Sequence, residues 1–348
     1  MNKRFQNALN RIPQKTPPVW FMRQAGRYHK HYQGLRSKYS FMELCKRPDL
    51  AAEVALGPIK DFDFDVSILF SDLLFPLEAL GMGLKYEDTG PKLGWQLTPQ
   101  NVFQLKKLKE ALPLLEFQQD AVFKTRQLLP KDKSLIGFIG GPWTLFTYAV
   151  EGSHKGSLTP TKCWMKALYP EFCKYLVQLL IENIKLQLAG GAEIIMIFDT
   201  AAGELSPKIF QDLVENHLGE IANYFPKKIG YYSKGTTEAH LQVLEKIRPH
   251  LAGIGVDHRF EMSSLLKSGV KSEVKSGNTG FVQGNFDQSL LFLPKQEFLE
   301  ELFRYLEPIK NLSIEERAGW VSGLGHGVLP VTPEENVRLF VSTVREVL

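Results

Sequence analysis

Two arginines stand four residues apart in the segment Arg23-Gln-Ala-Gly-Arg27, with small residues between them. A guanidinium is always charged, and its planar fork of N–H donors matches the oxygens of a carboxylate or a phosphate. Gly26 lowers helix propensity here without an evident packing benefit. The segment therefore favours an anion-binding role for Arg23 and Arg27. The alternative is that both arginines pair with surface acids.

An acid and a histidine follow two further apolar runs. Asp72 comes after Val-Ser-Ile-Leu-Phe, where an unpaired carboxylate would be unfavourable. We therefore expect Asp72 to have a partner, either a backbone N–H group that it caps or a bound ligand. His326 lies between two glycines, which let a ligand approach closely. It could serve as an acid, a base, a metal ligand or a hydrogen-bond donor, although most single histidines do none of these.

Short apolar segments that could position these groups recur along the chain. Turn residues bound each segment, and a helical pattern follows most of them. Parallel strands need such crossovers and are covered on their outer faces, so the alternation predicts an α/β fold. We expect a single-domain (β/α)8 TIM barrel spanning residues 1–348, although an open doubly wound sheet would give a similar pattern. The predicted strands are 19–22, 66–70, 135–138, 194–198, 229–232, 253–256, 280–282 and 320–322.

The carboxyl ends of barrel strands are where this fold places its chemistry, so we expect the active-site cleft there. In this chain those ends carry charged, hydroxyl and imidazole groups. They are Arg23 to Arg27, Ser71 and Asp72, the Gly140-Gly141-Pro142-Trp143 segment that leads to Tyr148, Asp199 and Thr200, Gln283 to Asn285, and His326.

Helix signals and the cysteines give further expectations. Apolar residues at helical spacing follow Phe172, and Gly190-Gly191 supplies the stop. Thr332 is expected to cap the last helix, with Pro333 in its first position and Glu335 completing a capping box. The cysteines are odd in number and fit neither a disulfide framework nor a metal knuckle, so they are predicted to be buried thiols. They are Cys45, Cys163 and Cys173.

Composition excludes several classes of protein. The 348 residues are 44% hydrophobic and 23% charged, which is typical of a globular protein and not of a disordered one. With 42 basic and 38 acidic residues, the net charge of +4 is too small to favour nucleic-acid binding. No apolar run reaches the roughly 18 residues of a membrane span, and the polar start does not resemble a signal peptide, so we expect a cytoplasmic protein. His29 and His31 form only a weak metal-binding pair, and no phosphate-binding loop, dinucleotide fingerprint or nucleophile elbow is present.

The strand-end segments resemble the uroporphyrinogen decarboxylase family along nearly the whole chain. MRQAGRY, FSDLL and GPWTL with its following YxVEG are long, ordered signatures. The matching stretches are PVWFMRQAGRY at 18–28, ILFSDLLFPLEALGMG at 68–83, GFIGGPWTLFTYAVEG at 137–152, IFDTAAGELSP at 197–207, FVQGNFDQ at 281–288 and GLGHGVLPVTPEENV at 323–337.

The resemblance implies a cofactor-free and metal-free (β/α)8 barrel, usually a homodimer whose two clefts face each other. Its substrate would be uroporphyrinogen III, which the family converts to coproporphyrinogen III by four decarboxylations. The family motif places catalytic roles on Asp72, Arg23 and Tyr148. It places substrate contacts on Arg23, Gln24, Ala25, Gly26, Arg27, Asp72, Tyr148, Thr200 and His326, and weaker ones on Arg36, Phe138 and Phe198.

Three positions depart from the family pattern. Thr200 stands where the family often has serine, so a hydroxyl is kept with an added methyl group. Ala201 replaces a residue that is frequently bulky, and Gly323 replaces a common asparagine. Two rival functions stay open at this point: a corrinoid-linked methyltransferase with a zinc site built from His and Cys, and a tetrapyrrole carrier without turnover. The cysteine positions argue against the first rival, and the intact arginine, aspartate and tyrosine residues argue against the second.

Overall fold

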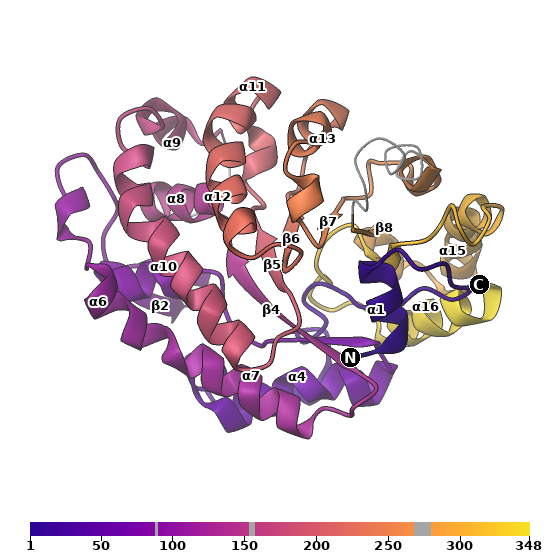
Figure 1. Ribbon diagram of the computed structural model, residues 1–348. Helices are drawn as coiled ribbons and strands as arrows, with labels where there is room; N and C mark the ends of the chain where they lie inside the picture. The colour runs from indigo at the N-terminus through magenta and orange to yellow at the C-terminus, as the bar shows by residue number, and fades with distance from the viewer. Residues whose placement is uncertain (88–89, 153–156, 268–279) are drawn as a thin grey trace.

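The computed structural model describes residues 1–87, 90–152, 157–267 and 280–348 (Figure 1). Its centre is a curled sheet of seven parallel strands in the order β1-β4-β5-β6-β7-β8-β9. Helices pack around the outside of this sheet (Figure 1). The strands are β1 (Val66–Ile68), β4 (Ser134–Gly140), β5 (Ile195–Phe198), β6 (Ile229–Tyr232), β7 (Gly253–Gly255), β8 (Phe281–Phe286) and β9 (Trp320–Leu324).

Continuous apolar character explains why these segments form buried parallel strands. Every residue of β4 is buried, and so is every residue of β5, β6, β7, β8 and β9. The ladders are in register, with Gly137 beside Ile195 and Ile195 beside Ile229. Strands covered on both faces lack the alternation of a half-exposed sheet. The predicted α/β class is therefore confirmed.

The helices connect successive strands and cover them. The predicted helix after Phe172 is confirmed as part of α10, which begins earlier, at Tyr169, and has Gly190 as its C-cap. A separate antiparallel pair, β2 (Leu84–Glu87) and β3 (Gly90–Leu93), follows β1. The helices are α1 (Lys3–Leu9), α2 (Lys30–Arg36), α3 (Phe41–Lys46), α4 (Pro48–Phe62), α5 (Phe75–Leu77), α6 (Leu108–Ala111), α7 (Glu116–Leu128), α8 (Pro142–Glu151), α9 (Thr159–Trp164), α10 (Tyr169–Ala189), α11 (Pro207–Phe210), α12 (Asn216–Tyr224), α13 (Glu238–Leu244), α15 (Lys295–Lys310) and α16 (Glu334–Val347).

The first predicted strand, 19–22, is not a strand in the structure. Val19 forms a single parallel bridge with Ser322 of β9, and its carbonyl accepts a 2.9 Å hydrogen bond from the N–H of Asp65. Pro18 precedes it and has no N–H to give to a ladder. Arg23, at φ 59°, turns the chain soon afterwards. The segment is therefore too short to form a ladder, although it lies between β9 and the start of β1.

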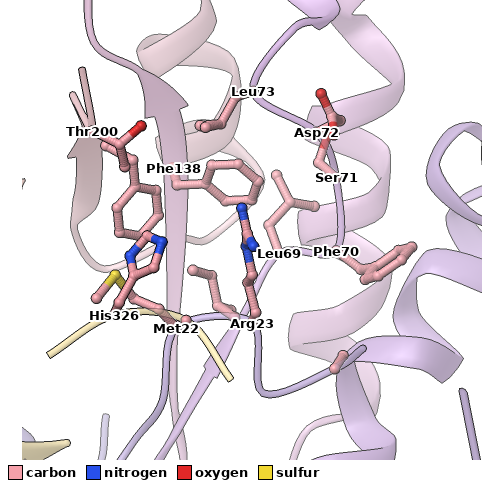
Figure 2. A pocket seen from close by; sticks show the side chains of 14 residues that line it. Met22, Arg23, Leu69, Phe70, Ser71, Asp72, Leu73, Phe138, Thr200 and His326 are labelled. Carbon is pink, nitrogen blue, oxygen red and sulfur yellow. The ribbon is translucent and has the colours of Figure 1, made fainter. Parts of the chain in front are cut away.

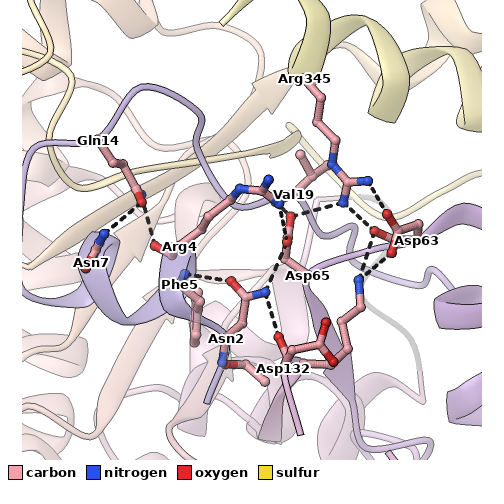
Figure 3. Close-up of polar contacts among 12 residues, drawn as sticks. Asn2, Arg4, Phe5, Asn7, Gln14, Val19, Asp63, Asp65, Asp132 and Arg345 are labelled. Atoms are coloured by element: carbon pink, nitrogen blue, oxygen red, sulfur yellow. Dashed lines mark hydrogen bonds and ion pairs between the residues drawn. The ribbon is translucent and has the colours of Figure 1, made fainter. Parts of the chain in front are cut away.

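The buried carboxylate of Asp65 holds the 19–22 segment in place through hydrogen bonds (Figure 3). Asp65 accepts hydrogen bonds from the Val19 N–H at 2.9 Å and from Asn2 Nδ2 at 3.1 Å. Arg4 of α1 donates to it at 3.1 Å, and Arg345 of α16 approaches it at 3.5 Å. One side chain therefore connects both ends of the chain to the segment that leads to Arg23.

Three local predictions are wrong. Thr332 does not cap α16, because the chain turns at Val331 (φ 60°) and the Thr332 hydroxyl donates to the Leu329 carbonyl at 2.8 Å. Pro333 occupies the N-cap position instead.

Cys45 and Cys173 are buried as predicted, but Cys163 is exposed because it lies on the short surface helix α9. The residues from Gln283 to Asn285 were expected just after a strand end. They lie inside β8, because the ladder with β9 continues to residue 286. Along the described ranges, no helix is long and apolar enough to cross a membrane.

Candidate active site

A pocket opens beyond the carboxyl ends of β1, β4, β5 and β9 (Figure 2). The space between its lining atoms is about 790 Å³, a figure that includes open solvent. Its wall is mostly apolar with a few charged and polar groups. The lining residues are Met22, Arg23, Ala25, Ile68, Leu69, Phe70, Ser71, Asp72, Leu73, Phe138, Phe198, Thr200, His326 and Gly327.

Arg23 points into the middle of this pocket, between Phe138 and Leu69 (Figure 2). Its backbone adopts the left-handed region at φ 59°, which is uncommon for a residue with a side chain. Space for the arginine depends on Gly327, because a Cβ added there would lie 2.6 Å from Cδ of Arg23. The glycine after His326 thus makes room for the cation.

Gln24 fixes the turn that presents Arg23. Its side-chain oxygen accepts from the Phe21 N–H at 3.2 Å, and its Nε2 donates to the Val66 carbonyl at 3.0 Å. The Gln24 carbonyl accepts the hydroxyl of Tyr28 at 2.7 Å. The side chain is 1% exposed and is not part of the pocket wall. Gln24 therefore connects the arginine turn to the start of β1.

Asp72 lies on the opposite side of the pocket from Thr200 (Figure 2). Its Oδ1 accepts a 2.8 Å hydrogen bond from the N–H of Leu74, so the expected backbone partner is present. The carboxylate is partly accessible from the pocket but is closely surrounded by protein. Burial raises its pKa, whereas hydrogen bonding from Tyr86 and the Leu74 N–H, together with the charge of Arg23, acts in the lowering direction. Asp72 thus combines a local turn with a position facing the pocket.

Tyr148 comes from α8, is partly exposed and is not among the lining residues. Burial raises its pKa to about 12; the negative charge of Asp72 adds to this increase and the charge of Arg23 opposes it. Buried Asp199 holds the start of α8, accepting from the N–H and the hydroxyl of Thr144 at 2.8 and 2.7 Å. Burial raises the pKa of Asp199 to about 6. The Thr144 hydroxyl also accepts from the Ala201 N–H at 2.9 Å, so this contact joins α8 to the Thr200 turn.

Thr200 and His326 form another part of the wall, above an aromatic floor. The rings of Phe138 and Phe198 lie 5.6 Å apart there. The Tyr232 hydroxyl donates to the Gly325 carbonyl at 2.7 Å and lies 3.1 Å from Nδ1 of His326. Because the tyrosine proton goes to the carbonyl, Nδ1 of the imidazole is the donor in the second contact. The neutral ring therefore carries its proton on Nδ1.

The pocket thus brings together five of the nine main predicted site residues, Arg23, Ala25, Asp72, Thr200 and His326, and two of the three weaker ones, Phe138 and Phe198. Four others, Gln24, Gly26, Arg27 and Tyr148, are not in its lining. Arg27 is exposed, and Arg36 is exposed with its guanidinium on the Tyr39 carbonyl at 2.6 Å.

The sequence did not single out the apolar wall residues Met22, Ile68, Leu69 and Leu73, nor Gly327 as the residue that makes room for Arg23. Their positions within the quoted motifs were the available signal. Among the described residues, no group of three or more His, Cys, Asp or Glu side chains is placed to hold a metal ion.

Comparison with known proteins identifies the family. A family model described as "Uroporphyrinogen decarboxylase (URO-D)" matches residues 1–347. The curated protein named uroporphyrinogen decarboxylase from Anaeromyxobacter dehalogenans is 34% identical over 362 residues, which cover 99% of this chain and 98% of the relative. The protein of the same name from Rickettsia bellii is 35% identical over 348 residues, with 97% of both chains covered.

A solved structure of a methyltransferase from Methanosarcina mazei shares the fold. It has a TM-score of 0.74 and 19% identity, and the match covers 99% of this chain and 98% of the other. Identity this low speaks for the fold alone, whereas the family model and the curated relatives match in sequence over almost the full length. The chain belongs to the uroporphyrinogen decarboxylase family.

Proposed function

We propose that the pocket binds uroporphyrinogen III and removes carbon dioxide from its four acetate side chains, giving coproporphyrinogen III. As a member of this family, the chain is a carboxy-lyase of tetrapyrrole biosynthesis. The observation that carries the proposal is the pairing of Arg23 and Asp72 in one apolar pocket. The Arg23 cation can bind a carboxylate of the substrate, and the Asp72 anion can accept hydrogen bonds from its pyrrole N–H groups.

Decarboxylation requires a sink for the electrons that the leaving carbon dioxide leaves behind. Protonation of the pyrrole at its α-carbon creates a cation that is conjugated to the acetate arm. The C–C bond electrons then neutralise this cation and leave an exocyclic methylene group. This carbon takes up a proton to become a methyl group, and the α-carbon gives up the proton that it had accepted, which restores the aromatic pyrrole. Asp72 would accept hydrogen bonds from the pyrrole N–H groups and stabilise the ring cation as it forms.

The remaining polar groups would hold the carboxylates of the substrate. Arg23 lies where it can bind one acetate, and it could relay a proton, although arginine is a weak acid. Arg27 would bind a carboxylate at the exposed rim. Thr200 can donate its hydroxyl, Tyr148 lies near enough to Asp72 to be affected by its charge, and His326 can donate from Nε2 when its ring is protonated. Gln24 would support Arg23 from behind the wall.

Several properties of the whole molecule belong to the same proposal. The segment around Val19 would take the place of the eighth strand, because its backbone pairs with β9 on one side and accepts a hydrogen bond from the Asp65 N–H on the other. The chain would then be one closed (β/α)8 barrel domain over residues 1–348. The family resemblance supports a cytoplasmic homodimer without metal or organic cofactor. Light scattering on the purified protein measures the oligomeric state.

The deciding experiment is anaerobic incubation with uroporphyrinogen III, with chromatography of the hepta- to tetracarboxyl products. We expect full conversion without any added factor. A parallel sample treated exhaustively with a chelator should turn over at the same rate. Loss of turnover on chelation, with recovery on adding zinc, would favour the methyltransferase-type metal site and refute the cofactor-free mechanism. Substrate binding without product would favour a carrier.

A further inference from the structure

The sheet opens between β1 and β4 at the level of the pocket. The ladder between these strands pairs Ile68 with Ile136 and ends with a 2.9 Å hydrogen bond from the Leu69 N–H to the Ile136 carbonyl. Phe138 lies two residues farther along β4, and its backbone faces the same side, because Gly137 between them bonds toward β5. Since β1 has ended at this level, the N–H and the carbonyl of Phe138 need other partners.

The side-chain amide of Gln187 supplies both partners. This residue comes from α10 and is 0% exposed. Its Oε1 accepts from the Phe138 N–H at 2.9 Å, and its Nε2 donates to the Phe138 carbonyl at 2.9 Å. Gly137 leaves space for the amide, since a Cβ there would lie 2.2 Å from Oε1 of Gln187. The glutamine thus continues the ladder where β1 has ended.

A second buried glutamine extends these hydrogen bonds to the pocket wall. Nε2 of Gln187 donates to Oε1 of Gln118 on α7 at 3.1 Å, and Nε2 of Gln118 donates to the hydroxyl oxygen of Ser71 at 2.9 Å. Gln118 is 2% exposed, whereas Ser71 lines the pocket next to Asp72 (Figure 2). The two amides therefore join the floor of the pocket at Phe138 to its wall at Ser71.

The backbone fixes the direction of each hydrogen bond in this chain. The Phe138 N–H can only donate, so the oxygen of the Gln187 amide faces it and the NH2 group faces Gln118. By the same reasoning, the oxygen of Gln118 faces Gln187 and its NH2 group faces Ser71. The Ser71 oxygen is thus an acceptor, and its own O–H is left to donate elsewhere. Within the described ranges, this hydroxyl makes no second hydrogen bond to the protein.

Packing explains Gln187 but not Gln118. Gln187 satisfies the Phe138 backbone and would still do so without its neighbour. The hydrogen bonds of the Gln118 side chain go to Gln187 and Ser71. Methionine would fill nearly the same space on α7 without a buried amide that needs partners. What Gln118 adds is therefore the orientation of the Ser71 hydroxyl.

We infer that Ser71 is a further substrate-binding residue, which donates its hydroxyl proton to a peripheral carboxylate of the substrate, and that Gln118 is the positioning residue that orients this donor. The inference rests on the proposed function, because a polycarboxylate substrate supplies the acceptor. A carboxylate only accepts, so it suits a wall hydroxyl whose oxygen is already occupied. Arg23 supplies a charge in the same pocket, and Ser71 adds a directed neutral donor.

The first test is the initial rate of uroporphyrinogen III decarboxylation by Ser71→Ala. A hydrogen bond to a carboxylate that does not react stabilises substrate and transition state equally. KM should therefore rise about tenfold while kcat stays near the parental value. Thr125→Val is the matched control, because the buried Thr125 hydroxyl lies on the same helix as Gln118 and donates within it, to the Ala121 carbonyl at 2.7 Å. Its KM should equal that of the parent.

A double-mutant cycle tests the positioning role. Gln118→Met should raise KM severalfold, and the double variant with Ser71→Ala should have the same KM as Ser71→Ala alone, because the amide acts through that hydroxyl. If the two increases multiply, Gln118 serves packing and its positioning role is refuted, while the binding role of Ser71 stands.

Gln118→Glu tests the same role by pH and keeps the shape of the side chain. A protonated carboxyl can donate to Ser71 as the amide does, whereas the ionised form can only accept and would take the serine proton. The ratio of its KM to the parental KM should therefore be near one at low pH and increase as the pH rises. In the Ser71→Ala background this dependence should disappear. A ratio that does not change with pH across the activity range would also refute the positioning role.

Thermal melting shows which variants are folded, and the outcomes separate the two levels of the argument. If the parent decarboxylates uroporphyrinogen III and folded Ser71→Ala keeps the parental KM, only the inference about Ser71 and Gln118 fails. If the parent does not decarboxylate uroporphyrinogen III, the proposed function fails and the inference fails with it.

Discussion

Replacing Asp72 with asparagine isolates the charge of this side chain from its local structural role. Asparagine has nearly the same volume, and its side-chain oxygen can still accept the 2.8 Å hydrogen bond from the Leu74 N–H. The turn before α5 should therefore survive, and Tm should stay within a few degrees of the parent. Any large loss of activity must then come from the missing charge.

The size of that loss follows from where Asp72 lies. The carboxylate is partly accessible at the pocket wall, so an effective dielectric near 20 is appropriate. A pyrrole cation at about 4 Å would gain roughly 4 kcal/mol under these conditions, which is about a thousandfold in rate if the interaction exists only in the transition state. The amide dipole keeps part of this stabilisation, while its NH2 group would face the pyrrole donors. We expect kcat to fall by about two to three powers of ten.

Single-turnover decarboxylation and thermal melting on one preparation provide the assay. A loss confined to the chemical step indicates transition-state stabilisation, whereas a rise in KM alone would indicate uniform binding of substrate and transition state. If Asp72 served only the turn with Leu74, asparagine would replace it almost without effect. A stable and fully active Asp72→Asn protein would refute the reasoning.

Three further changes probe the rim, the wall and the frame of the site. Arg27→Lys keeps the charge but loses the planar fork, so KM for uroporphyrinogen III should rise about tenfold; unchanged saturation kinetics would remove Arg27 from the site. Gly327→Ala places a Cβ 2.6 Å from Cδ of Arg23, so kcat/KM should fall by about tenfold to a hundredfold with little change in Tm. Asp65→Asn puts an NH2 group among the donors from Asn2, Arg4 and Val19 and removes a buried charge, so denaturant titration should show a loss of about 3 kcal/mol. A loss below about 0.5 kcal/mol would show that the contacts to Asp65 are not cooperative.

The sequence predicted most of the sheet because buried parallel strands are continuous apolar runs. The segments 194–198 and 229–232 are nearly coincident with β5 and β6. The segment 19–22 looks the same in sequence, but strand formation depends on partners. Pro18 has no N–H to give to a ladder, and the turn at Arg23 ends the segment before a ladder can form. Apolar pattern alone carries no information about either neighbour.

The site was predictable where strand ends and side-chain chemistry coincide. This rule located Arg23, Asp72, Thr200 and His326, all of which line the pocket. It could not locate Gly327 as the residue that makes room for Arg23, because this contact joins two segments that lie far apart in the sequence.

In the Arg23–Arg27 segment, some residues line the pocket and others hold the backbone that positions them. Arg23 and Ala25 line the pocket, whereas the Gln24 amide bonds to the backbone of Phe21 and Val66. A residue in the left-handed region holds its conformation only when the surrounding structure fixes it, and the bonds of Gln24 provide that constraint. A change at Gln24 would therefore reach the substrate through Arg23. Since a misplacement of about 1 Å can reduce a rate by about a hundredfold, such a change would look like the loss of a direct contact in a kinetic assay.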